Sequence, residues 1–123
     1  MMSSIWILFG VLSCALCVIL GAFGAHALEE VLDEYRKGIF QTATIYHFFH
    51  SIALIINGLL AKNFNDLNFI FSGYLFIIGI ILFSFSLYAL AITQIKILGA
   101  ITPFGGVCFI LGWLYIAFQV YNN

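Results

Sequence analysis

Long blocks of hydrophobic residues alternate with short polar segments along this chain. Asp, Glu, Lys and Arg are absent from residues 1–28, 38–61, 67–93 and 97–123. A helix needs roughly 20 apolar residues to cross the hydrocarbon core of a bilayer. Because lipid cannot pair with backbone polar groups, apolar blocks of this length are expected to be helices. The pattern predicts four membrane spans, at about residues 5–25, 39–61, 67–91 and 103–120.

The segments between these spans are short, which favours antiparallel neighbours. We therefore expect an all-α fold, a transmembrane four-helix up-down bundle that forms a single integral membrane domain over residues 1–123. Thr102 and Pro103 predict the start of the last span, since Thr can cap a helix and Pro suits its first position. The first span lacks the positive n-region of a signal peptide, so we expect it to be retained.

Residues 28–38 have a different pattern from the spans. Apolar residues recur at helical spacing from Leu28 to Ile39, and six charged residues occupy the positions between them. This pattern predicts a short interfacial amphipathic helix after the first span, with Tyr35 at the level of the lipid headgroups. Its charged face would be a solvated linker surface or, alternatively, a surface for a partner.

Composition and charge limit the classes of protein to consider. Hydrophobic residues make up 64% of the chain and charged residues 7%, whereas soluble domains carry about 25% charge. This excludes a soluble globular protein and a disordered one. The net charge of −1 offers no field for nucleic acid. The expected partner is the lipid bilayer, together with a second copy of the chain or other membrane proteins.

The basic residues predict an orientation in a plasma (inner) membrane. Arg36, Lys37 and Lys96 fall on one side of the predicted bundle, and Lys62 and the terminal amine fall on the other, a bias of three to two. Cytoplasmic loops carry an excess of Lys and Arg. The bias favours cytoplasmic first and third loops, with both termini outside.

Small residues recur along one face of the first and last spans. Such residues let helices approach closely in lipid, and a repeat of 3.5 residues is typical of a left-handed bundle. The predicted helix-packing seam contains Gly10, Cys14, Cys17, Gly21 and Gly24 in the first span, and Gly105, Gly106, Cys108 and Gly112 in the last. A redox role for the Cys14–Cys17 pair is the alternative, but an apolar setting disfavours the reactive thiolate.

Polar residues share one face of the second span. His47, His50 and Asn57 follow a 3–4 spacing, and His26 leaves the first span on the side of the membrane where the second begins. With Thr102 they form a candidate functional or packing cluster, because polar residues within a span are costly. Three interpretations remain open: interhelical hydrogen bonds, a metal or haem site, and a proton or substrate site.

Other chemistry-bearing residues add little. No span contains an acidic residue that could orient a histidine, and the chain has no phosphate loop, dinucleotide fingerprint or zinc motif. We therefore expect no enzyme, no metal and no cofactor. Large aromatic residues near the span ends are expected to form an interfacial belt. These are Trp6, Trp113, Tyr115 and Tyr121.

Motifs in all four spans resemble one family. They are the Gly-Ala-Phe-Gly-Ala-His stretch at 21–26, residues 42–54, the Phe-Ser-Phe-Ser-Leu-Tyr stretch at 83–88, and residues 102–113 with Thr-Pro-Phe-Gly-Gly at their start. Together they resemble the domain-of-unknown-function 423 family of small multi-pass inner-membrane proteins. The resemblance implies a multi-pass plasma-membrane protein without an established activity. It also implies that His26, His50 and residues 102–106 lie close together.

Two positions depart from the family pattern: Phe85 stands where a glycine is expected, and His47 where Gln or another polar residue is expected. The leading functional hypothesis is a non-enzymatic membrane protein with a structural role, or a subunit of a larger assembly. The alternatives are a small oligomeric transporter or channel and a haem- or metal-binding membrane protein.

Overall fold

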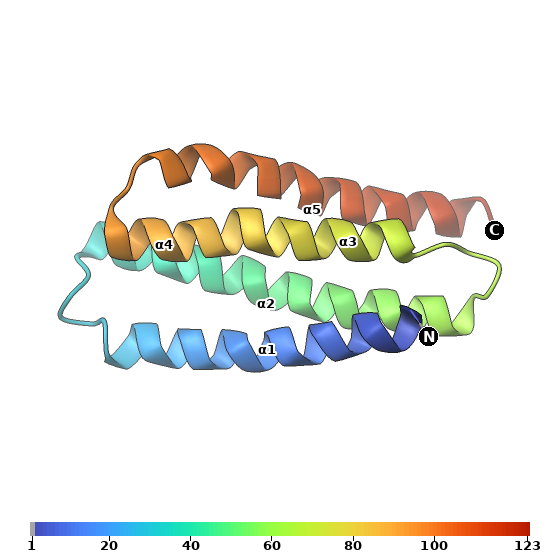
Figure 1. Cartoon of the computed structure of the whole chain (residues 1–123), viewed down its shortest axis with the longest axis horizontal. Helices are drawn as coiled ribbons and strands as arrows, with labels where there is room; N and C mark the ends of the chain where they lie inside the picture. The colour runs from blue at the N-terminus through green and yellow to red at the C-terminus, as the bar shows by residue number, and fades with distance from the viewer. Residues whose placement is uncertain (1) are drawn as a thin grey trace.

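The computed structural model describes residues 2–123, which form helices joined by turns. Helix α1 (Met2–His26), helix α2 (Glu34–Asn63) and helix α5 (Ile97–Tyr121) each form one span. The third span combines α3 (Ile70–Gly79), the π-helical segment η1 (Ile80–Phe85) and α4 (Ser86–Thr93). Each span is long and apolar enough to cross a membrane. Successive spans run antiparallel, and the chain returns to the end where it began (Figure 1). The predicted transmembrane four-helix up-down bundle is confirmed.

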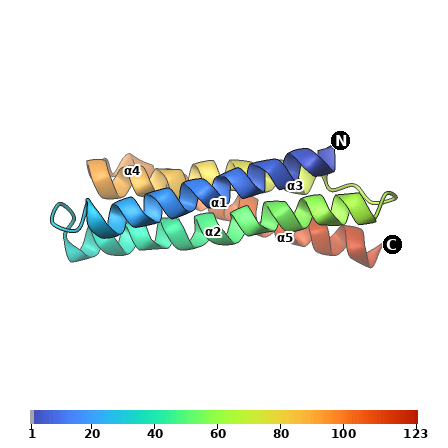
Figure 2. The ribbon, with the colours of Figure 1, turned by 90° about the horizontal axis from the view of Figure 1, so that it is seen from below.

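Helix α2 and the third span form the middle of the bundle and are its most buried parts. Helix α1 packs along α2, and the third span contacts both α2 and α5. Figures 1 and 2 show α1 beside α2, with the third span between α2 and α5 in Figure 1. Two hydrophobic clusters fill the interior, one around Phe40 and Tyr88 and the other around Trp6, Phe76 and Phe109. The outer faces of α1 and α5 are rich in exposed apolar side chains, as lipid contact requires.

The separate interfacial helix predicted for residues 28–38 is wrong. Residues 27–32 form turns, and α2 already begins at Glu34. Asp33 ends the turn with extended backbone, and its carboxylate accepts the Arg36 backbone N–H at 2.8 Å, which makes it the N-cap of α2. Leu28 and Leu32 are buried in the core. Leu28 and Leu32 therefore pack inward from a turn, whereas Val31 and Tyr35 of the predicted stripe stay exposed. An isolated helix of this length would be only marginally stable.

The predicted start of the last span at Thr102–Pro103 is also wrong. Helix α5 begins at Ile97, so both residues lie inside it. Gln94 adopts a left-handed conformation (φ 60°) that ends α4 and reverses the chain, which lets α5 start early. Thr102 donates its hydroxyl to the Leu98 carbonyl instead of capping the helix. Proline is tolerated inside membrane helices where neighbouring groups satisfy the freed backbone.

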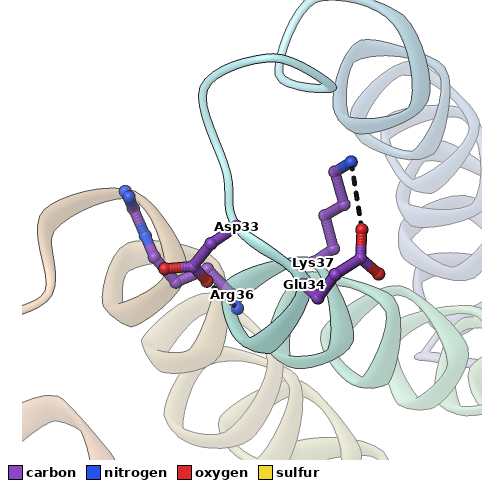
Figure 3. A network of polar contacts seen from close by, with 4 residues as sticks. All are labelled: Asp33, Glu34, Arg36 and Lys37. Carbon is purple, nitrogen blue, oxygen red and sulfur yellow. Dashed lines mark hydrogen bonds and ion pairs between the residues drawn. The ribbon is translucent and has the colours of Figure 1, made fainter.

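Arg36 joins the first turn of α2 to the last turn of α4. Its Nε donates to the Ala91 carbonyl at 2.5 Å, and its Nη2 donates to the Ile92 carbonyl at 2.9 Å. A cation at a helix C-terminus satisfies orphan carbonyls and complements the helix dipole. Figure 3 shows this end of the bundle with the adjacent ion pair of Lys37 and Glu34, whose Nζ and Oε1 atoms are 3.6 Å apart. Because the Glu34 carboxylate is almost fully exposed, this pair contributes little to stability.

The π-helical segment η1 lies where α5 comes closest to the third span. A Cβ added at Gly105 would collide with the backbone of Leu82 and Phe83. Within η1, Ser84 is fully buried, and its hydroxyl has no hydrogen-bond partner in the described part of the chain. Short π-helical segments interrupt α-helices at places where the side-chain register must change.

Candidate functional site

A chain of polar side chains around His47 joins three helices. Helix α2 contributes His47 and Ser51, α1 contributes Ser13 and α4 contributes Tyr88. The Ser13 hydroxyl lies 2.9 Å from His47 Nε2 and 2.6 Å from the Ser51 hydroxyl. The Tyr88 hydroxyl lies 2.9 Å from His47 Nδ1. His47 and Ser51 are fully buried, so these bonds replace those that water would provide.

One assignment of protons satisfies every group around His47. The Ser51 hydroxyl donates to the His47 carbonyl at 2.7 Å. Ser13 then donates to Ser51, His47 Nε2–H donates to Ser13, and the Tyr88 hydroxyl donates to Nδ1. A serine, a histidine and an orienting group also occur in nucleophilic catalysis. In this assignment His47 Nε2–H donates a hydrogen bond to the Ser13 hydroxyl. Nε2 therefore has no free lone pair to accept the serine proton, and the serine is not activated as a nucleophile.

His50 lies one turn further along α2 but contacts different partners. Its Nδ1–H donates to the Tyr46 carbonyl at 2.7 Å, and the Trp113 indole N–H donates to its Nε2 at 3.0 Å. The imidazole stacks on Phe109, with ring centroids 3.5 Å apart and planes 9° apart. A carbonyl can only accept and an indole can only donate. His50 is therefore a neutral imidazole with its proton on Nδ1, held against α5.

Asn57 and Thr102 form two further, separate polar contacts. The Asn57 amide donates to the Phe69 carbonyl at 2.9 Å and accepts the Ser72 hydroxyl at 2.6 Å, which joins α2 to the start of α3. The Thr102 hydroxyl lies 2.7 Å from that of Ser86 and joins α5 to α4. The predicted polar residues of the spans thus hold different helix pairs together at different places.

The three histidines do not form a common site. His26, the last residue of α1, is exposed, and no hydrogen bond joins it to His47 or His50 within residues 2–123. In that part of the chain no three His, Cys, Asp or Glu side chains are grouped so that they could hold a metal ion. His50 contacts the fourth span through Phe109 and Trp113, beyond the residue 102–106 motif. Gly105 of that motif packs on Phe83.

The glycines of the predicted seam and Cys17 lie at helix contacts. A Cβ at Gly10 would approach Ile55 Cγ1 of α2 to 2.7 Å, and one at Gly112 would approach the Phe76 ring of α3 to 2.7 Å. The Cys17 thiol lies 3.4 Å from the Thr44 carbonyl. Gly24 lies against Phe40, Gly21 lies near Thr44, Gly106 lies near Phe83, and Cys14 and Cys108 are half-buried.

Sequence reasoning missed Ser13, Ser51 and Tyr88. Ser13 follows Gly10 by three residues and precedes Cys17 by four, so seam spacing places it on the face toward α2. Ser51 follows His47 by one turn. The aromatic belt predicted for Trp6 is wrong: this side chain is 1% exposed and packs on Gly73. The glycine supplies the space that admits the indole.

The comparisons with known proteins agree on one family. The sequence profile described as "Protein of unknown function (DUF423)" matches residues 20–106. A UPF0382 membrane protein of Staphylococcus epidermidis is 45% identical over 112 residues, which cover 91% of each chain. The UPF0382 membrane protein YwdK of Bacillus subtilis is 42% identical over 113 residues, which cover 91% of this chain and 92% of YwdK.

A third relative, the UPF0382 membrane protein SAB0533 of Staphylococcus aureus, is 40% identical over 118 residues, which cover 96% of each chain. No solved structure matches the chain. The profile match covers more than half of the sequence, and the relatives align over nearly all of it. This chain therefore belongs to the DUF423 family and is a multi-pass membrane protein.

Proposed function

We propose that this protein is a non-enzymatic structural component of the plasma membrane, a scaffold or an assembly subunit. In this proposal the intramembrane histidines hold helices together. The observation that carries it is that both ring nitrogens of His47 and of His50 are engaged by groups of the same chain. Metal and haem ligation require a nitrogen lone pair, and the Trp113 N–H occupies that of His50 Nε2.

The hydrogen bonds of the interior support the same role. Helices in lipid gain little from the hydrophobic effect, and they associate through close packing and interhelical hydrogen bonds. His47 links α1, α2 and α4, and His50 links α2 to α5. Together the two residues connect all four spans. A role as a structural centre explains both histidines without a ligand.

The charge distribution favours one orientation for the scaffold. Arg36, Lys37 and Lys96 lie at the end where α1 joins α2 and α4 joins α5, and Lys62 lies near the opposite end. The positive-inside rule then assigns the first end to the cytoplasm and both termini to the outside. A cysteine at position 123, in a variant without the native cysteines, would then react with an impermeant thiol reagent in intact cells. If this cysteine reacted only after the cells were lysed, the C-terminus would lie in the cytoplasm and the proposed orientation would be wrong.

The structural role is tested by replacing His50 and measuring two properties of the variant: its stability against unfolding, and its ability to bind haem or conduct ions. His50→Leu leaves the Trp113 N–H unpaired and removes the stacked imidazole, so we expect a loss of about 2 kcal/mol in detergent. His26→Leu, at the exposed end of α1, is the matched control and is expected to leave stability unchanged.

Chemical activity is measured on the same proteins. Purified wild type is expected to show no Soret band after haem addition and no proton flux in liposomes above empty vesicles. The proposal fails if His50→Leu keeps the wild-type unfolding midpoint but abolishes a haem spectrum or an ion flux that the wild type displays.

A further inference from the structure

A hollow of about 450 Å³ opens on the outer surface between α1 and α2, near the end of the bundle where these two helices are joined. Its lining changes from the charged residues Glu29 and Lys37 at the end of the bundle to Gln41, Thr44 and Ile45 further along α2. None of the histidine contacts described above lines it. The hollow is therefore separate from that site.

Gln41 places an amide without a partner on this surface. The 30 residues of α2 span about 45 Å, so a centred α2 extends about 7 Å beyond each side of a hydrocarbon core of about 30 Å. Gln41 lies about 10 Å from the start of α2 and thus inside the core. Its side chain is exposed, and no hydrogen bond joins it to another residue among 2–123. Acyl chains offer an amide neither a donor nor an acceptor, so this position is costly without a polar partner.

Gly38 leaves space beside Gln41 that this chain does not fill. It is the fifth residue of α2 and lies one turn before Gln41 on the same exposed face. Glycine inside a helix is less stable than alanine, and a Cβ added at Gly38 would have nothing within 4 Å. Gly24 differs, because its missing side chain admits the Phe40 ring. Packing within the chain therefore does not explain Gly38, whereas the close approach of a second helix does.

The polar groups of the hollow are complementary to a copy of themselves. In a dimer whose two-fold axis is parallel to the membrane normal, each residue meets residues at its own depth, and every contact occurs twice. Two Gln41 amides can then pair, because each is both a donor and an acceptor. Glu29, which has no ion pair among residues 2–123, can pair with Lys37 of the other copy in both directions. A lipid would satisfy the charges but not the amides in the core.

We infer that a second copy of this chain docks on this surface, in the same orientation, with the two-fold axis beside Gln41. The inference rests on the proposed role in assembly and names the partner as the chain itself. Gly38 lets the two α2 helices approach, and Gln41 pairs with its counterpart inside the core. Glu29 and Lys37 pair at the level of the headgroups.

The test uses the full-length protein in lipid bilayers, with donor and acceptor fluorophores on a C-terminal tag of two mixed populations. Association is read from energy transfer as the ratio of protein to lipid is lowered. Gln41→Leu removes the amide, and Gly38→Leu fills the space beside it. Thr42→Val is the matched control, because the Thr42 hydroxyl is exposed on the same helix but already donates to the Gly38 carbonyl.

We expect Gln41→Leu to weaken association about ten-fold, which corresponds to about 1.4 kcal/mol and is typical of a polar pair between membrane helices. Gly38→Leu should weaken association at least as much, yet its unfolding midpoint should not fall below that of the wild type, since its side chain meets nothing within the chain. Thr42→Val should associate as the wild type does.

Charge reversal tests the geometry of the dimer. Lys37→Glu alone opposes two carboxylates across the interface, and Glu29→Lys alone opposes two ammonium groups, so each should weaken association at least about five-fold. Mixing the two variants places opposite charges at both contacts and should restore association, which an ion pair within one chain would not do.

A wild type that stays monomeric, with or without bound lipid, would overturn the inference. Association that is unchanged in both Gln41→Leu and Gly38→Leu, or that does not recover when the charge-reversed variants are mixed, would overturn it as well. These outcomes are independent of the unfolding, haem and ion measurements on His50→Leu that test the proposed function.

Discussion

His47 and His50 stand one helical turn apart on α2 and are both buried, yet their surroundings differ in kind. His47 is surrounded by hydroxyl groups from Ser13 and Tyr88. His50 is held by an indole N–H, a backbone carbonyl and the face of Phe109. Hydroxyls both donate and accept, whereas the partners of His50 each do only one of these. The same residue type therefore serves an adaptable polar network at one position and a rigid aromatic contact at the other.

This difference predicts that substitutions around His50 destabilise the protein more than substitutions around His47. A network of hydroxyls can reverse its donors and acceptors when one member is replaced. The His50 contact depends on ring shape and on a single tautomer, so it loses more when either partner moves. Four predictions follow this contrast from the largest expected effect to the smallest.

The largest loss of stability is expected from Gly105→Leu. This substitution prevents the close packing of α5 on the third span, which the contact between His50 and α5 requires. The new side chain would meet the backbone of Leu82 and Phe83, which cannot rotate away. Separation of the helices should cost about 3 kcal/mol in an unfolding titration in detergent. Gly106→Leu is the matched control, because a Cβ there stays 3.7 Å from the Phe83 ring. Equal losses in the two variants would contradict the close approach at Gly105.

Trp113→Phe should have the next largest effect. It removes the donor to His50 Nε2 and reduces contact with Phe76. We expect a loss of about 1.5 kcal/mol, since hydrogen bonds between membrane helices contribute up to about 1.7 kcal/mol. Nitrogen NMR should show the Nδ1–H form of His50 in the wild type and a mixture of tautomers in the variant. Retention of a single tautomer in the variant would mean that the indole does not select it.

Tyr88→Phe should cost less, about 0.6 kcal/mol, the average for such bonds. It removes one hydroxyl from the His47 network, and Ser13→Ala removes the other partner of the imidazole. Because both hydroxyls act on one ring, the losses of the double variant should not add. Strict additivity in a double-mutant cycle of unfolding free energies would show that the network does not act as a unit.

His47→Gln should have the smallest effect, about 0.5 kcal/mol, because Gln also presents a donor and an acceptor to Ser13 and Tyr88. His50→Gln should cost at least twice as much, since an amide cannot replace the imidazole stacked on Phe109. Thermal unfolding of the two variants compares the sites directly. A larger loss at position 47 than at position 50 would reverse the contrast between them.

The sequence predicted the four spans because length and hydropathy decide whether a helix crosses a bilayer. It failed at two boundaries where a neighbour decides the outcome. Burial of Leu28 and Leu32 turned the predicted interfacial helix into a turn. The left-handed Gln94 let α5 begin before Pro103. Neither the packing of the first loop nor the backbone conformation of a glutamine is visible in a hydropathy pattern.

The candidate site was predicted only as a set of residue types on one face. Residues three apart on an α-helix differ by about 60° in direction, which is enough for His47 and His50 to reach different neighbours of a central helix. The position of His26 at the end of α1 indicated its depth in the membrane but not its direction around the helix. The hydroxyl partners were missed because Ser and Tyr are common, and their role depends on which helices adjoin.

The π-helical segment η1 changes the direction around the helix axis in which the side chains of α4 point relative to those of α3. A π turn contains one more residue than an α turn, so it rotates everything after it by about 100° relative to an unbroken α-helix. If residues 80–85 formed an unbroken α-helix with the same number of residues, Tyr88 would swing away from His47. The π turn therefore decides which side of α4 meets the histidine, and deletion of one residue within it would restore a regular helix with Tyr88 still facing His47.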